Sequence, residues 1–191
     1  MQHDLIGQLS REEQLALKNR RTGMAIFQIS WIMVFVCLVM VNYLVRGNQV
    51  SWPPPGVAKP EAVLPSVSTL ILIASGFLVR RAARAVRADR LPAFLPNWRW
   101  ALVLGAVFVV IMAYEWLAIP YSGQYSNMFR VMVGFHAVHA LAIGVYMVQI
   151  QRGARAGVYH ARHFWPVEAG ASLWYFVIVA WVLFYLVLYW L

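Results

Sequence analysis

The sequence predicts an all-α polytopic membrane protein, a bundle of five transmembrane helices, and three observations carry that prediction. Hydrophobic residues make up 62% of the 191 residues and charged residues only 12%, whereas a soluble domain carries about 25% charged residues. The mean hydropathy is +0.63. Finally, five stretches reach the length of about 20 helical residues that crosses a hydrocarbon core: 24–45, 63–79, 100–119, 129–150 and 169–191.

The first stretch, 24–45, follows an N-terminal tail of residues 1–23. This tail carries Glu12 and Glu13, and the apolar run begins too late for a cleavable signal peptide, so we expect a retained span. No internal repeat is visible, and residues 24–191 are expected to form one membrane domain.

The second stretch, 63–79, is the weakest of the five because Pro65 and several hydroxyl residues dilute it. It still counts as a span, since its apolar run continues until the charges begin at Arg80. The prolines of residues 51–60 favour an extended conformation. They predict a stiff connection between the first two spans.

The distribution of the net charge of +9 indicates membrane topology and argues against a nucleic-acid partner. Most basic residues fall in the N-terminal tail and in the second and fourth connections, which lie on one side of the five spans. By the positive-inside rule, the N-terminus is expected in the cytoplasm and the C-terminus outside. Anionic lipid head groups are the expected counter-charges. The other side has only Arg46, Lys59 and Arg130. The basic residues of the first side are Arg11, Lys18, Arg20, Arg21, Arg80, Arg81, Arg84, Arg87, Arg90, Arg99, Arg152, Arg155 and Arg162.

Four polar side chains, Glu115, Arg130, His136 and His139, are expected to lie close together near the outer side of the membrane. His136 and His139 are three residues apart, so they share one face of the fourth helix. Ionisable groups inside a membrane are costly and are therefore functional candidates. Our main hypothesis is a structural clamp in which Glu115 contacts His136 or Arg130 between the third and fourth helices.

A metal or haem site and a proton relay are the alternatives for this cluster. Metal sites take three or four ligands, but only two histidines and one carboxylate are available there, because His160 and His163 lie at the other end. No metal is therefore expected. Chains of glutamate and histidine are typical of proton paths, so a proton relay stays open.

Four segments, in order along the chain, resemble motifs of one membrane protein family. They are PSVSTLILIASG (65–76), beside the family's PxxNTxxLxxSS, and GAVFVVIMAYEW (105–116), beside GxxFxxxQxxE(Y/W). The other two are YSNMFRVMVGFHAVHALAIG (125–144), beside YGSxFFxxTGFHGxHVxxG, and HFWPVEAGASLWYFVIVAW (163–181), beside HxxxxExxxxYWHFVDVVW. The chain thus resembles subunit III of the haem-copper terminal oxidases, in a short five-helix form that lacks the family's first two helices.

Several polar positions of the family pattern are apolar or aromatic in this chain. The first shared helix reads GMAIFQISW where the family has GMWxFLxSE, so Trp31 stands in place of a glutamate. Tyr175 and Ile178 replace the histidine and aspartate of the family's HFVD, and Met112 replaces an amide. Proton buffering or carbodiimide reactivity at the lost carboxylate is not carried over, and we expect a divergent member.

The resemblance implies a non-catalytic subunit of a respiratory oxidase that reduces oxygen to water and pumps protons. In this family the histidines hold helices together, and the haem and copper belong to subunits I and II, so this chain is expected to bind no cofactor except phospholipid. Subunit III packs on subunit I and helps to sustain proton uptake and oxygen access. The expected partners are oxidase subunits I and II and phospholipids, in a bacterial plasma membrane.

The resemblance also implies a lipid site and contacts at the cytoplasmic end of the helices. Lipid is expected between the first two helices and the other three, with Arg80, Arg81 and Arg84 near its phosphates. His163 and Glu168 are expected to make contacts at the cytoplasmic end.

Two other functions remain as alternatives. One is a diverged accessory or assembly protein of the same fold, such as one accompanying a nitric oxide reductase, which Trp31 and Ile178 favour. The other is an independent b-type haem or proton-translocating membrane protein, and only this one predicts a Soret band from the isolated chain.

Overall fold

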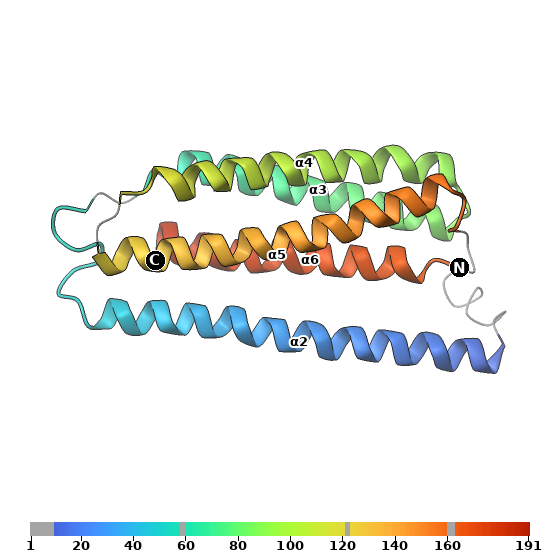
Figure 1. The fold of residues 1–191 in the computed structure, drawn as a ribbon, viewed down its shortest axis with the longest axis horizontal. Helices are drawn as coiled ribbons and strands as arrows, with labels where there is room; N and C mark the ends of the chain where they lie inside the picture. Colours follow the sequence, from blue (N-terminus) through green and yellow to red (C-terminus); the bar gives the residue numbers. More distant parts are fainter. Residues whose placement is uncertain (1–9, 58–59, 121–122, 160–162) are drawn as a thin grey trace.

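The computed structural model describes residues 10–57, 60–120, 123–159 and 163–191 (Figure 1). In these ranges it contains five helices that are long and apolar enough to cross a membrane, and no strand. The predicted all-α membrane fold is therefore confirmed. Residues 1–9 of the expected tail, Lys59, His160 and Arg162 lie outside the described residues. The helices are α2 (Arg11–Gly47), α3 (Val63–Arg87), α4 (Leu91–Ala118), α5 (Gly123–Arg155) and α6 (Trp165–Tyr185), which continues as the π-helical turn η1 (Leu186–Trp190).

Successive helices run antiparallel, and four of them close into a bundle (Figure 1). Helix α3 packs along α4 and α6, and α5 packs between α4 and α6, whereas α2 lies against α6 and α5. The first two helices therefore do not form a pair set apart from the other three, which is where lipid is expected from the resemblance. The long apolar face of α3 is taken up by α4 and α6, so α2 alone flanks the bundle.

Two helices start earlier than their apolar stretches, α2 at a capping box and α4 with a proline in its first turn. Helix α2 begins at a capping box, in which the Ser10 hydroxyl accepts a hydrogen bond from the Glu13 amide (3.2 Å) and the Glu13 carboxylate accepts one from the Ser10 amide (2.8 Å). Such a box satisfies amide groups that a helix start leaves unpaired. Residues 11–23 of the expected tail are thus helical. Helix α4 begins at Leu91 with a proline in its first turn, where the missing proline N–H costs nothing.

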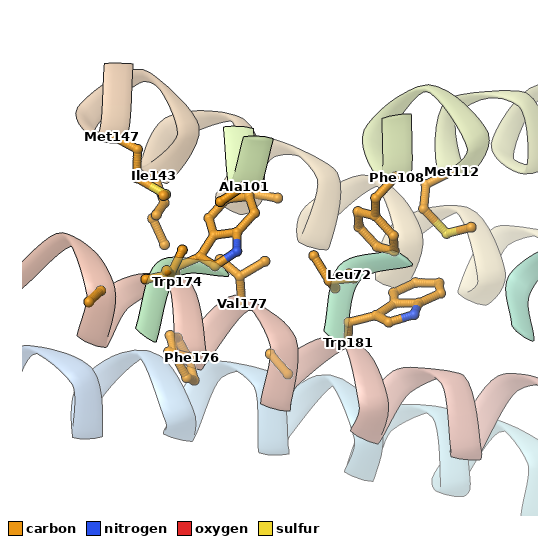
Figure 2. Packing of buried hydrophobic residues seen from close by; sticks show 14 of the residues in the cluster. Leu72, Ala101, Phe108, Met112, Ile143, Met147, Trp174, Phe176, Val177 and Trp181 are labelled. Carbon is orange, nitrogen blue, oxygen red and sulfur yellow. The ribbon is translucent and has the colours of Figure 1, made fainter. Parts of the chain in front are cut away.

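Large aromatic side chains fill the core between α3, α4 and α6. Trp181 lies against Phe108 (Figure 2), with ring centroids 5.0 Å apart. The Trp181 indole donates a hydrogen bond to the Thr69 hydroxyl (2.8 Å), and the Trp174 indole donates one to the Ser75 hydroxyl (2.9 Å). These two indole–hydroxyl bonds join α6 to α3 at two levels of the bundle.

Helix α2 is mostly exposed, and only Phe35 and Asn42 among its residues are buried. One hydrogen-bonded pair inside the apolar region joins it to α6, between the Gln28 amide and the Ser172 hydroxyl (3.0 Å). Packing of α2 therefore depends on a small number of side chains.

Most arginines gather at one end of the bundle, where α2, α4 and α6 begin and α3 and α5 end (Figure 1). We call it the arginine-rich end. The opposite end carries Arg46 and Arg130. The arginines that define the arginine-rich end are Arg20, Arg21, Arg80, Arg81, Arg84, Arg87, Arg90, Arg99, Arg152 and Arg155.

Candidate functional site

The two histidines of α5 lie in the interior of the bundle, with 1% of His136 and 7% of His139 exposed. Aromatic rings from α2, α4 and α6 surround them, and we call these rings the aromatic cage. His139 stacks on Trp31 of α2 with ring centroids 5.2 Å apart and an interplanar angle of 26°. The cage consists of Trp31, Phe35, Phe108, Phe176, Trp181 and Phe184.

Phe35 lies at the centre of the contact between α2 and the histidines. Its ring centroid is 6.1 Å from that of His136 and 5.2 Å from that of His139. On the other side of His136, the Phe108 and Trp181 rings lie 5.8 and 5.3 Å away. The histidine pair therefore joins α5 to α2, α4 and α6 through ring packing.

Hydrogen bonding contributes little to this cluster. Among the described residues, three imidazole nitrogens have no hydrogen-bond partner: Nδ1 and Nε2 of His136 and Nδ1 of His139. A buried polar group without a partner costs about 1–3 kcal/mol. Ring packing around the imidazoles must offset that cost.

Trp31, which stands where the resembling motif has a glutamate, packs on the histidine pair. The side chain at this position faces the imidazole of His139. An indole there stacks on the imidazole, whereas a carboxylate would offer it charge and hydrogen bonds.

Arg130 joins α5 to the end of α4. Its Nη2 donates to the Ile119 carbonyl (2.6 Å), and its Nε donates to the Trp116 carbonyl (3.4 Å). The guanidinium also lies over the Trp116 ring, 5.6 Å from its centroid, and the Trp116 indole donates to the Arg130 carbonyl (3.0 Å). A cation at the C-terminal carbonyls of a helix is stabilising, because those carbonyls lack helical partners.

Glu115 lies apart from this arrangement. Its side chain is half-buried, and it forms no hydrogen bond or ion pair with another described residue. The contact expected between Glu115 and His136 or Arg130 is therefore not formed in this part of the chain. The guanidinium of Arg130 binds backbone carbonyls of α4 instead, and the imidazoles are enclosed by rings.

At the arginine-rich end, Glu168 joins three helices. Arg21 of α2 lies 2.9 Å from its Oε1, and Arg87 of α3 lies 3.6 Å from its Oε2. His163 stacks on Tyr159 with centroids 6.1 Å apart. Sequence inspection found Glu168 but neither of its partners, because many arginines were available and only the fold selects two.

Of the three arginines expected near a lipid, Arg80 and Arg84 line one pocket of about 440 Å³ together with Arg87, Ser172 and Tyr175. Arg81 is exposed and does not line that pocket. The pocket lies between α3 and α6 beside the Glu168 ion pairs.

The described residues contain no group of three or more histidine, cysteine, aspartate or glutamate side chains placed to hold a metal ion.

Comparisons with a family model and with known proteins all give the same family. The family model described as Cytochrome c oxidase subunit III matches residues 7–191. Cytochrome c oxidase subunit 3 of Thermostichus vulcanus is 34% identical over 176 residues, which cover 89% of this chain and 86% of that protein. The protein of the same name from Synechocystis sp. is 27% identical over 176 residues, covering 89% and 75%. That from Lumbricus terrestris is 30% identical over 192 residues, covering 95% and 74%.

Proposed function

Because the chain belongs to the cytochrome c oxidase subunit III family and is a subunit III of a haem-copper oxidase, we propose that it acts there as a non-catalytic packing subunit. It assembles with subunits I and II, which carry the haem and copper. It lies in a bacterial plasma membrane with its arginine-rich end in the cytoplasm. The asymmetric distribution of the arginines supports this orientation, and the relatives from Thermostichus and Synechocystis support a bacterial membrane.

The observation that carries the packing role is the enclosure of His136 and His139 by aromatic rings from three other helices. His136 contacts rings of α2, α4 and α6, and His139 contacts rings of α2 and α6. Trp31 strengthens this arrangement by stacking on His139. The contribution of this chain to proton uptake and oxygen access is then indirect, through the stability of the assembled complex.

A phospholipid phosphate is proposed to bind in the pocket of Arg80 and Arg84. Three guanidinium groups line this pocket with Glu168 as the one carboxylate, and that carboxylate also pairs with Arg21 of α2. The pocket therefore carries excess positive charge at the level of the head groups. Anionic lipids supply the matching charge at a membrane surface.

His136→Ala in a tagged chain within the oxidase tests the packing role. We expect less assembled complex, while the haem absorbance per assembled complex stays unchanged. Val138→Ala is the matched control, because Val138 lies on the same helix between the two histidines and is exposed. A loss of haem absorbance per complex in the His136 variant would contradict the proposal, as would equal assembly of the two variants.

A further inference from the structure

A long apolar groove lies on the surface between α4 and α5, separate from the Arg80 and Arg84 pocket. Its volume is about 790 Å³, within the range of about 300–1,000 Å³ that is usual for ligand pockets. Exposed aliphatic side chains form its walls, among them Val103 and Val110 on α4 and Leu141 and Val145 on α5.

The floor of the groove is fixed by α6. Trp174 reaches it beneath Gly105, where an added Cβ would lie 2.5 Å from the indole. The hydrogen bond from Trp174 to Ser75 (2.9 Å) holds that indole in place. Gly144 on the opposite wall faces open space, since an added Cβ there meets no atom within 4 Å. The groove is thus a formed surface that the described side chains leave open.

The length of the groove matches one leaflet of a bilayer. It extends along residues 99–110 of α4 and 140–152 of α5, which is about 16–18 Å at a helical rise of about 1.5 Å per residue. Half of a hydrocarbon core of about 30 Å is about 15 Å. An acyl chain from a single leaflet therefore has the right length to lie in it.

Positive charge is concentrated at the head-group end of the groove. Arg99 and Arg152 line it, and Arg155 lines an adjoining pocket of about 610 Å³ together with Arg99 and Gln151. None of these arginines forms an ion pair or hydrogen bond within residues 10–57, 60–120, 123–159 and 163–191. No carboxylate lines either space.

We propose that the groove between α4 and α5 binds an anionic phospholipid, with one acyl chain between the helices and the phosphate between Arg99 and Arg152. Guanidinium groups bind phosphate oxygens through paired, charge-assisted hydrogen bonds. An apolar transmembrane helix of another subunit would fill the apolar part but would bring no counter-charge for the two arginines. The charge pattern therefore favours the lipid.

Counting phospholipids in the intact oxidase, purified in mild detergent through a tag on this chain, tests the proposal. Native mass spectrometry gives the number of lipids and the subunit content of each complex. Gly144→Leu fills the groove, and the double variant Arg99→Gln/Arg152→Gln removes the partners of the phosphate. We expect each to lose one anionic phospholipid and to keep its subunits. After delipidation, the wild-type complex should regain that lipid from phosphatidylglycerol vesicles but not from phosphatidylcholine vesicles.

Two control variants make the result specific. Gly23→Leu changes another glycine whose added Cβ meets no atom, and Arg20→Gln/Arg90→Gln removes two exposed arginines outside the groove. Both should keep the full lipid count. An unchanged count in both groove variants would overturn the proposal. Loss of a partner subunit from the Gly144 variant without loss of lipid would also overturn it, in favour of a partner helix.

The outcome is distinguishable from that of the Arg80 and Arg84 pocket. A variant with Arg80→Gln/Arg84→Gln should lose a lipid independently of the groove variants. If only this variant loses lipid, the groove proposal fails and the pocket proposal stands.

Discussion

Replacing Phe35 by alanine removes the largest buried side chain through which α2 packs on the rest of the bundle. Phe35 is 1% exposed, and Asn42 is the one other buried residue described in α2. The Phe35 ring centroid lies 5.2 Å from those of His139 and Phe184 and 5.4 Å from that of Phe176. The substitution opens a space between α2, α5 and α6.

The expected cost follows from these contacts. Phenylalanine-to-alanine changes in soluble cores cost about 3–5 kcal/mol, which includes transfer from water and the cavity left behind. In a membrane the transfer part shrinks, because lipid is as apolar as the core. The cost of losing the ring pairs is not reduced in this way, and each pair is worth about 0.5–1.5 kcal/mol. We therefore expect Phe35→Ala to lower the free energy of unfolding by about 3 kcal/mol.

Titration with sodium dodecyl sulfate, followed by tryptophan fluorescence of the chain in mild detergent, measures this free energy. Phe77→Ala is the matched control, because Phe77 is 62% exposed on α3, and surface changes stay within about 0.5 kcal/mol. Equal effects of the two substitutions would refute the argument that Phe35 holds α2 in place.

Four further substitutions, at three positions, are expected to change the same free energy of unfolding, measured by the same titration. Glu168→Gln removes the carboxylate bound by Arg21, which is partly exposed, so the loss should be about 1 kcal/mol and smaller at high salt; a loss that grows with salt would contradict this. Gly105→Val sets a Cβ 2.5 Å from the Trp174 indole and should cost about 1–3 kcal/mol by overpacking; a neutral result would show that Trp174 can move. Trp31→Ala should cost about 1–2 kcal/mol, because the indole is only partly buried and loses mainly its ring pairs, and Trp31→Phe, which keeps a ring in the cage, should cost clearly less; equal costs would exclude ring stacking as the cause.

The sequence predicted the five spans well and the helix ends poorly. Hydropathy finds only the apolar part of a helix, so it gave 24–45 for a helix that spans Arg11–Gly47. The extension was present in the sequence as Ser10 followed three residues later by Glu13, a capping-box pattern. Likewise, α4 begins nine residues before its apolar stretch. Pro92 lies in its first turn, where proline is tolerated, and Pro96 lies inside the helix without ending it.

The candidate site was predictable as a set of residues but not as a set of contacts. Helical spacing placed His136 and His139 on one face, yet nothing in the spacing indicated that α2 would supply Trp31 and Phe35 to enclose them. Glu115 was expected near His136 because depth along the helix was the only coordinate available. Helix α5 begins at Gly123, six residues before its apolar stretch, so His136 lies deeper in the bundle than predicted. It packs against Phe108 of α4, which is seven residues, or about two helical turns, from Glu115.

The indole–hydroxyl bonds between α6 and α3 were also not predictable from the sequence. Thr69, Ser75, Trp174 and Trp181 all belonged to segments that resemble the family motifs, but the sequence assigned them no role. Each bond joins residues about 100 positions apart (99 and 112 in the chain). Only the packing of α3 on α6 brings such partners together.

The central claim is that this chain binds no haem and works as a packing subunit of a haem-copper oxidase. The most direct test is to tag the chain, solubilise the membrane in mild detergent, and record the absorbance spectrum and protein content of the purified material. The account predicts a haem-copper spectrum together with subunits I and II, and no Soret band from the chain once it is separated from them. A colourless solitary protein, or a Soret band that stays with the isolated chain, would contradict it.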